Sequence, residues 1–244
     1  MTKNNIPGIP YANTRETRAP SSAILSSCPV IRKKSSKKKL AIIGGSKVST
    51  KIKTLLSLTS SCSDIFIGGA MANTFIKSKG GNIGKSLFEE DNLSVANSLI
   101  EKAEKQNVKI YLPEDIVCSK SIDNYNTKIF NSYNLPDEYS GFDVGYKSIN
   151  AFKEVIKKSK KIIWNGPMGV FEIDAFSKGT FEICNSVTEA TKKGAFTLVG
   201  GGDSVSAVKK NNQENNISFI STGGGALLEY ISNGTLPSFE LLNN

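Results

Sequence analysis

The sequence predicts an α/β protein of Rossmann-like, three-layer α/β/α architecture, built on a mostly parallel sheet of about six strands. Six short apolar runs alternate with longer segments in which apolar residues recur at helical spacing. The runs are apolar almost throughout, as expected for parallel strands that helices cover on both faces. Glycine-containing turns follow five of the runs, as expected where a strand passes directly into a helix.

The elements follow in a regular order along the chain. The expected strands are Leu40–Ile43, Asp64–Ile67, Val108–Leu112, Lys161–Trp164, Phe196–Val199 and Ile217–Ile220. The expected helices are 49–59, 71–79, 93–106, 147–159, 178–192, 203–210 and 225–232. The stretch 118–146 contains Asn, Pro, Asp and Gly throughout, so we expect a long loop or excursion there. The period differs between units, which argues against a repeat array.

The positive charge of the protein is concentrated at its N-terminus. The chain has 244 residues and a formal net charge of +9, and residues 1–39 contain nine Lys or Arg and one acid. All three arginines lie in this segment, which is rich in Ser, Pro, Asn and Lys. We therefore expect residues 1–38 to be a basic, disordered segment and residues 39–244 to be one folded domain. A transit peptide is the alternative, but no amphipathic helix is evident, so we expect a cytoplasmic protein.

Several classes of function are disfavoured by what the sequence lacks. No apolar run approaches the roughly 20 residues of a membrane span. The chain has no histidine and no CxxC pair, which disfavours a zinc site. Neither GxGxxG nor GxxxxGK(S/T) occurs, which disfavours a dinucleotide dehydrogenase and a Walker-type NTPase. We expect the four cysteines to be reduced and mostly buried: Cys28, Cys62, Cys118 and Cys184.

The glycine turns are the most informative feature of the sequence. They read Gly44-Gly45-Ser46-Lys47, Gly68-Gly69-Ala70-Met71, Asn165-Gly166-Pro167-Met168-Gly169, Gly200-Gly201-Gly202-Asp203-Ser204 and Ser221-Thr222-Gly223-Gly224-Gly225. A single glycine pair usually means no more than a tight turn. Five such turns at the carboxyl ends of parallel strands would line the ligand crevice and present backbone N–H groups to an anion. We therefore expect a phosphate-rich ligand, and a nucleotide fits best.

Read in order, these segments resemble the C-terminal lobe of phosphoglycerate kinases. The matching stretches are LAIIGGSKVSTKI, IFIGGAMANTF, GKSLFEED, YLPEDIV, DVGYKS, IIWNGPMGVFEIDAFSKGT, LVGGGDSVSAV and ISTGGGALLEYISNGTLP. The resemblance implies a glycolytic phosphotransferase that exchanges a phosphoryl group between 1,3-bisphosphoglycerate and ADP, giving 3-phosphoglycerate and ATP. It also implies a nucleotide-binding domain over residues 39–244. In the family an N-terminal lobe holds the acidic substrate through Arg and His.

That N-terminal lobe has no counterpart in residues 1–38, and the sequence from Lys39 onward contains neither Arg nor His. A doubly anionic substrate normally meets bidentate arginines. We therefore expect this chain to bind ADP or ATP with Mg²⁺, and to handle 1,3-bisphosphoglycerate or 3-phosphoglycerate only when an N-terminal lobe is supplied. We further expect a monomer with no nucleic-acid or membrane partner.

The resemblance also implies roles for particular residues. Lys47 would contact the transferred phosphoryl group, and the amides of Gly223, Gly224 and Gly225 would receive it. Asp203 would contact Mg²⁺, although an Asp at this point would also suit a helix N-cap. Nucleotide contacts are implied for Gly45, Ser46, Lys51, Gly68, Gly69, Asn165, Pro167, Glu172, Gly200, Gly201, Gly202 and Ser204. Within that set, Glu172 is similar to a ribose-binding glutamate, and Gly68 with Gly69 to an adenine wall.

Three residues depart from the family pattern. Ala70 stands where a third glycine is usual, Tyr146 replaces a proline, and Phe219 replaces a histidine.

Two other functions stay open beside phosphoglycerate kinase. One is a truncated or degenerate nucleotide-binding module without full turnover, which the absent lobe favours. The other is a nucleic-acid or membrane-surface binder, which rests only on the basic run Arg32–Lys39.

Overall fold

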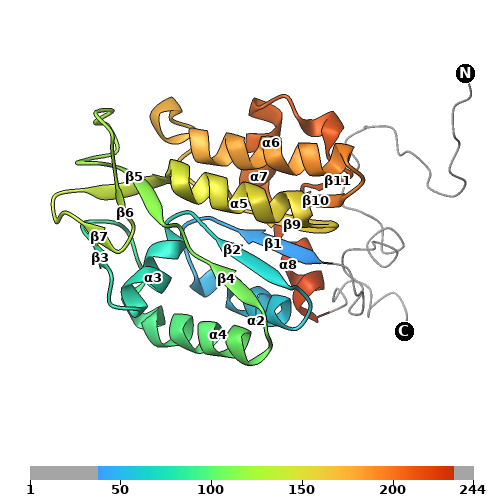
Figure 1. The fold of residues 1–244 in the computed structure, drawn as a ribbon, viewed down its shortest axis with the longest axis horizontal. Helices are drawn as coiled ribbons and strands as arrows, with labels where there is room; N and C mark the ends of the chain where they lie inside the picture. Colours follow the sequence, from blue (N-terminus) through green and yellow to red (C-terminus); the bar gives the residue numbers. More distant parts are fainter. Residues whose placement is uncertain (1–37, 234–244) are drawn as a thin grey trace, which may run out of the picture.

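Six parallel strands form the central sheet in a computed structural model that describes residues 38–233 (Figure 1). The strands lie in the order β11-β10-β9-β1-β2-β4, and every neighbouring pair is parallel. They are β1 (Lys39–Ile43), β2 (Asp64–Ile67), β4 (Lys109–Tyr111), β9 (Lys161–Asn165), β10 (Phe196–Gly200) and β11 (Phe219–Ser221). The predicted fold class and all six predicted strands are confirmed. The chain builds outward from β1 in one direction and then from β9 in the other, so the switch point of this doubly wound sheet lies between these two strands.

Helices cover both faces of the sheet, as Figure 1 shows. On one face lie α2 (Ile52–Thr59), α3 (Met71–Ser78), α4 (Leu93–Lys105) and α8 (Gly224–Asn233). On the other face lie α5 (Tyr146–Lys158), α6 (Lys178–Lys192) and α7 (Gly202–Lys210). Short 3-10 helices are η1 (Ser49–Lys51), η2 (Glu90–Asn92), η3 (Asp174–Phe176) and η4 (Glu214–Asn216). Every predicted helix is present within a few residues of its expected bounds.

Strand β1 shows how the sequence builds the two layers. All five of its residues are buried, and alternate side chains point to opposite faces. Ala41 and Ile43 join the core beneath α2, α3 and α4, whereas Leu40 and Ile42 join the core beneath α5 and α6. A continuous apolar run is therefore what this central strand requires.

The helices end in a way that the local sequence explains. Helix α4 buries Ala96, Leu99 and Ala103, which recur at helical spacing on one face. It ends in a Schellman motif, in which the N–H of Val108 donates to Ala103 and the N–H of Asn107 donates to Glu104. The same pattern closes α3, α6 and α7, and in each motif one residue has positive φ: Gly80, Asn107, Gly194 and Asn212.

The stretch 118–146, predicted to be a long loop or excursion, is an excursion from the central sheet and not a loop. Most of it forms a small β-structure with its own core, made of β5 (Asp115–Ser119), β6 (Lys128–Asn131) and β8 (Ser140–Val144) in one antiparallel sheet. Two further short strands, β3 (Asn82–Ile83) and β7 (Asn134–Leu135), pair in parallel. The exposed β6 has no apolar alternation, so long-range pairing and not local pattern determines these strands.

Several predictions about the chain ends lie outside the described residues. These include the basic segment up to residue 37, the thiol of Cys28 and the end of the domain beyond residue 233. The other three cysteines are buried and free, as predicted. Within residues 38–233 no helix combines the length and apolarity that crossing a membrane would require.

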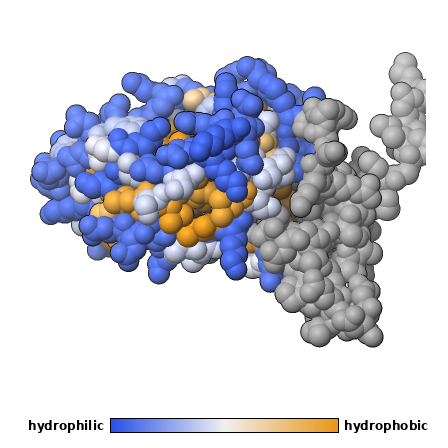
Figure 2. All heavy atoms as spheres, turned by 90° about the horizontal axis from the view of Figure 1, so that it is seen from below, coloured by the Kyte–Doolittle hydropathy of each residue, from blue (hydrophilic) through white to orange (hydrophobic). Residues whose placement is uncertain are grey.

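Figure 2 views the molecule from the side of α2 and α4, where an apolar stripe runs between hydrophilic borders. The partly buried apolar residues of these two helices are Ile52, Leu56, Val95 and Ile100.

A buried carboxylate fastens α6 to the rest of the domain. Asp143 is 4% exposed and accepts hydrogen bonds from the N–H of Val144 at 2.9 Å and of Gly179 at 2.6 Å. A Cβ atom at Gly169 or Gly179 would lie within 2.3 Å of its oxygens, so only glycine fits against it at both places. Burial raises the pKa of Asp143 to about 8, against the effect of the two amide bonds.

Replacing this side chain should therefore destabilise the domain. We expect Asp143→Ala to lower the free energy of unfolding by about 3 kcal/mol, because two buried N–H groups lose their acceptor. The folded pKa lies above the ordinary value of 3.8, so the stabilisation by Asp143 is complete below that value and is lost as the pH rises through about 8. Urea unfolding should thus show a larger difference from wild type near about pH 5 than near about pH 8. Asp123→Ala, at an exposed aspartate, is the matched control, and equal midpoints for the two variants would contradict the assignment.

Candidate active site

The five glycine turns lie side by side at the carboxyl edge of the sheet. They follow β1, β2, β9, β10 and β11, and together we call them the glycine rim (residues 44–47, 68–70, 165–168, 200–204 and 221–225). All predicted site residues belong to this rim except Lys51, one helical turn further on, and Glu172, which lies in the loop after β9. The structure therefore gathers residues that are up to about 180 positions apart in the chain.

Hydrogen bonds join each turn of the rim to the next, between backbone groups everywhere except between the turns after β9 and β10, where side chains take part. Gly45 N–H donates to Pro167, Gly69 N–H donates to Met168, and Met71 N–H donates to Gly45. Across the switch point, Gly44 N–H donates to the carbonyl of Asn165 at 2.9 Å. On the far side, Gly201 N–H donates to Ser221 at 3.2 Å. The rim is thus one connected structure that extends across five strands.

Glycine is needed in the rim for two separate reasons. Four turns each contain one glycine with positive φ, where other residues are strained: Gly45, Gly69, Gly166 and Gly201. Gly69 is also closely packed, because a Cβ atom there would lie 2.5 Å from the carbonyl oxygen of Gly45.

Gly202 and Gly225 are different, since neither has positive φ and a Cβ atom at either would meet nothing within 4 Å. The described fold does not require glycine at these two positions. An open approach to backbone at the starts of α7 and α8 is what a bulky anion at those helix termini would require.

Lys51 places its ammonium group at the switch point. Its Nζ donates to the carbonyl of Gly44 at 2.5 Å and to that of Asn165 at 3.3 Å, so it bridges the turns after β1 and β9. An ammonium group has three donors, and the third is not used by these two bonds. Burial lowers the pKa of Lys51 from 10.5 to about 8, and the carboxylate of Asp203 opposes the shift. A phosphate at this point would restore the lost solvation of the charge.

Lys47 is exposed at the end of the first turn, near the carboxylate of Glu89, which was not among the site residues predicted from the sequence. Glu89 accepts hydrogen bonds from the N–H of Ser49 at 3.0 Å and from its hydroxyl at 2.5 Å. Partial burial opposes ionisation, but the bonds from Ser49 and Val48 and the charge of Lys47 lower the pKa of Glu89 overall. Glu89 lies within the quoted GKSLFEED stretch, yet no local signal linked it to a turn about 40 residues earlier.

Asp203 lies in the first turn of α7 and is exposed. The N-cap position belongs to Gly201, and no side-chain cap bond is present there, so the alternative role of Asp203 as a helix cap is not realised. The charge of Asp203 opposes the lowering of the Lys51 pKa, so the two groups lie close enough to interact. Nowhere in the described chain do three or more His, Cys, Asp or Glu side chains converge. One carboxylate beside a phosphate crevice fits Mg²⁺, which takes one or two carboxylates and completes its shell with phosphate oxygens and water.

Asn165 and Ser204 hold the rim together from within. The side-chain amide of Asn165 donates to the carbonyl of Gly200 at 2.7 Å, and the fully buried hydroxyl of Ser204 accepts the N–H of Gly166 at 2.6 Å. Both bonds connect the turn after β9 to the turn after β10. Trp164 is buried and donates to Gly166, so it packs in the core, as expected for a tryptophan at a strand end.

Glu172 is exposed on the loop between β9 and η3, and the neighbouring Phe171 is buried. The ammonium of Lys210, in the last turn of α7, donates to the carbonyls of Phe171 and Glu172, both at 3.2 Å. Lys210 was not among the residues predicted from the sequence. Its contact joins two segments about 40 residues apart, which no local pattern reveals.

The three departures from the family pattern fit the backbone without strain. Ala70 has φ of −63°, so a methyl group costs nothing in conformation there. Tyr146 is the first residue of α5, a position where proline is common but other residues also occur. Phe219 lies in β11 and packs against the core beneath α2 and α8.

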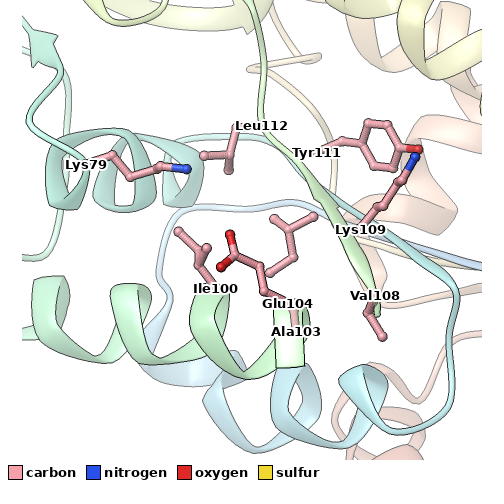
Figure 3. Close-up of a pocket in the computed structure, with 9 residues that line it drawn as sticks. Lys79, Ile100, Ala103, Glu104, Val108, Lys109, Tyr111 and Leu112 are labelled. Atoms are coloured by element: carbon pink, nitrogen blue, oxygen red, sulfur yellow. The ribbon is translucent and has the colours of Figure 1, made fainter. Parts of the chain in front are cut away.

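A separate hollow of about 270 Å³ lies between α4 and the edge strand β4 (Figure 3). Its lining is mostly apolar, with Lys79, Glu104 and Lys109 among the polar residues. None of its lining residues belongs to the glycine rim, so it is not the predicted site.

Comparison with known proteins identifies the family. The family described as phosphoglycerate kinase matches residues 25–234. A protein named phosphoglycerate kinase from Finegoldia magna is 51% identical over 204 residues, which are 83% of this chain and 51% of that protein. A solved structure of phosphoglycerate kinase from Coxiella burnetii matches with a TM-score of 0.80 and 39% identity, over 85% of this chain and 53% of the other. The structure from Pyrococcus horikoshii matches with a TM-score of 0.76 and 26% identity, over 91% of this chain and 55% of the other.

The chain spans about half the length of the curated relatives that it matches. The matched part includes every turn of the glycine rim. On the extent of the family match and the level of identity, this chain belongs to the phosphoglycerate kinase family.

Proposed function

We propose that this chain binds Mg-ADP or Mg-ATP in the glycine rim and supplies the nucleotide half of the phosphoglycerate kinase reaction. The supporting observations are that Lys51 bridges the turns after β1 and β9, that the charge of Asp203 acts on Lys51, and that hydrogen bonds join the glycine turns. In that reaction the bond between phosphorus and the carboxyl oxygen of 1,3-bisphosphoglycerate breaks. A new bond forms between the same phosphorus and a terminal oxygen of ADP.

Phosphoryl transfer depends on positioning and on positive charge near the moving group. Lys51 would hold the nucleotide phosphates at the switch point, and the exposed Lys47 would reach the group in transit. The N–H groups at the starts of α7 and α8 would bind phosphate oxygens, because a helix N-terminus favours anions. Asp203 would hold Mg²⁺, which neutralises phosphate charge when bound. Gly68 and Gly69 would line the adenine, and Glu172 would accept a hydrogen bond from the ribose.

A binding module without full turnover is the second candidate. The sequence from Lys39 onward has no Arg and no His, so the domain offers none of the bidentate donors suited to an acidic three-carbon substrate. The glycine rim thus offers backbone amides and Lys51 to a nucleotide, whereas residues 39–244 offer no arginine or histidine to that substrate.

The protonation of Lys51 should control nucleotide affinity. We expect the affinity for ADP to fall as the pH rises above about 8, because the free protein then loses the ammonium charge that attracts phosphate. Lys51→Met should weaken binding by about tenfold or more and remove this pH dependence. Isothermal calorimetry across the range tests both points. Lys47→Met is the control that should keep the dependence, and a wild-type affinity that stays level above about pH 8 would contradict the role of Lys51.

Asp203 should make nucleotide binding sensitive to Mg²⁺. Wild-type protein should bind ADP more tightly with Mg²⁺ than with a chelator, whereas Asp203→Asn should bind about equally in both conditions. Calorimetric titration of ADP measures the difference, and Asp123→Asn serves as a control for the loss of one surface charge. If Asp203→Asn retained the full Mg²⁺ effect, the metal contact would have to lie elsewhere.

Turnover should require a second lobe. We expect little ATP formation from 1,3-bisphosphoglycerate and ADP by this chain alone, and a gain when the N-terminal lobe of a full-length relative is added. A coupled assay of ATP formation gives the rate in each case, with Lys47→Ala as the negative control. Rapid turnover by the chain alone, or tight binding of 3-phosphoglycerate to it, would show that the substrate site is misplaced in our proposal.

A further inference from the structure

Helix α7 connects two residues that are predicted to bind the nucleotide, Asp203 and Glu172. Asp203 lies in its first turn, and Lys210 is its last residue. Lys210 reaches the loop that carries Glu172, which precedes it by 38 residues. A helix of nine residues is a stiff rod about 13 Å long. The position of the Glu172 loop is therefore tied to the helix that presents Asp203.

The contact of Lys210 is made to the main chain. Its ammonium donates to the carbonyls of Phe171 and Glu172. A further ion pair to Asp174 is 3.5 Å long, but Asp174 is 97% exposed, so this pair adds little. The ring of Phe181 on α6 lies 5.9 Å from the ammonium and supports it from another side.

The remaining backbone hydrogen bonds of the loop close its turn, where Ile173 N–H donates to Val170, and hold its two ends; none of them involves the Glu172 carboxylate. Val170 N–H donates to Phe142 before it, and Phe176 N–H donates to Ile173 after it. Within residues 38–233, no hydrogen bond or ion pair to the Glu172 carboxylate is present. Lys210 thus fixes the backbone on which the carboxylate stands and leaves the carboxylate itself available to a ligand.

We propose that Lys210 is a positioning residue that acts through Glu172 and sets how strongly the site distinguishes a nucleotide with ribose hydroxyls from one without them. This rests on the proposed function, because it takes the ligand to be a nucleoside diphosphate. A hydrogen bond to a sugar hydroxyl demands an acceptor held in place, since a mobile carboxylate loses much of the bond's free energy in ordering. The hydrogen bonds from Lys210 to the carbonyls of Phe171 and Glu172 hold the backbone of this acceptor in place.

The test compares the binding of ADP and 2′,3′-dideoxy-ADP by calorimetry in the presence of Mg²⁺. We expect wild-type protein to prefer ADP by about tenfold, in keeping with one hydrogen bond to a charged group. Lys210→Met should reduce that preference to about twofold by weakening ADP and leaving the dideoxy analogue almost unchanged. Lys210→Arg, which keeps a donor at this point, should restore most of the preference.

A mutant cycle shows whether Lys210 acts through Glu172. Glu172→Gln should reduce the preference as Lys210→Met does, and the double variant should lose no more than either single variant. Lys192→Met removes the corresponding lysine from the last turn of α6 and should leave the preference intact. Melting temperatures measured for each variant report whether the fold is retained.

Four outcomes would overturn the proposal. Equal weakening of both nucleotides by Lys210→Met would indicate a general structural effect, and multiplied losses in the double variant would show that Lys210 acts separately from Glu172. Equal binding of the two nucleotides by wild-type protein would remove the sugar contact, and the proposal with it, but would leave nucleotide binding in place. No binding of ADP at all would overturn the proposed function as well.

Discussion

The architecture of this domain depends on how closely the backbones of neighbouring turns approach one another at the carboxyl edge of the sheet. The N–H groups of Gly44, Gly45 and Gly69 reach carbonyls in the turn after β9, and a Cβ atom at Gly44 would lie only 1.9 Å from the carbonyl oxygen of Pro167. Such contacts are possible only without side chains. These contacts join three of the turns, and the bonds of Asn165, Ser204 and Gly201 join the other two, so the rim holds helix termini and charged side chains from distant parts of the chain close together.

The charges of the rim follow from that constraint. The ammonium of Lys51 donates to the carbonyls of Gly44 and Asn165. Burial there lowers the pKa of Lys51, and the charge of Asp203 opposes the shift. A cation that has lost hydration, beside helix N-termini whose amides point outward, has a strong affinity for phosphate. Glu89 adds a negative charge at the start of η1, close to Lys47. The site therefore combines one partly buried cation, one exposed cation and two carboxylates.

The family relationship and the length of the match give this domain its context. The chain matches about half of each full-length relative, and that half contains the whole glycine rim. The residues proposed for nucleotide binding all lie in this half, whereas an acidic co-substrate needs donors that residues 39–244 do not contain. The proposed nucleotide binding and the full reaction therefore have different physical requirements.

The sequence alone predicted the layers of the fold and the edge of the sheet at which the glycine turns gather. Apolar runs such as Leu40–Ile43 are continuous because both faces of a central strand are buried, and each glycine turn marks the carboxyl end of its strand. Those signals are local, so they can be read from neighbouring residues. Tertiary structure alone decided the rest. The strands of 115–144, the burial of Lys51 between two turns and the contacts of Glu89 and Lys210 all join residues that are far apart in the chain. Their partners are fixed only once the sheet order brings the elements together, because such pairing leaves no periodic trace in the sequence.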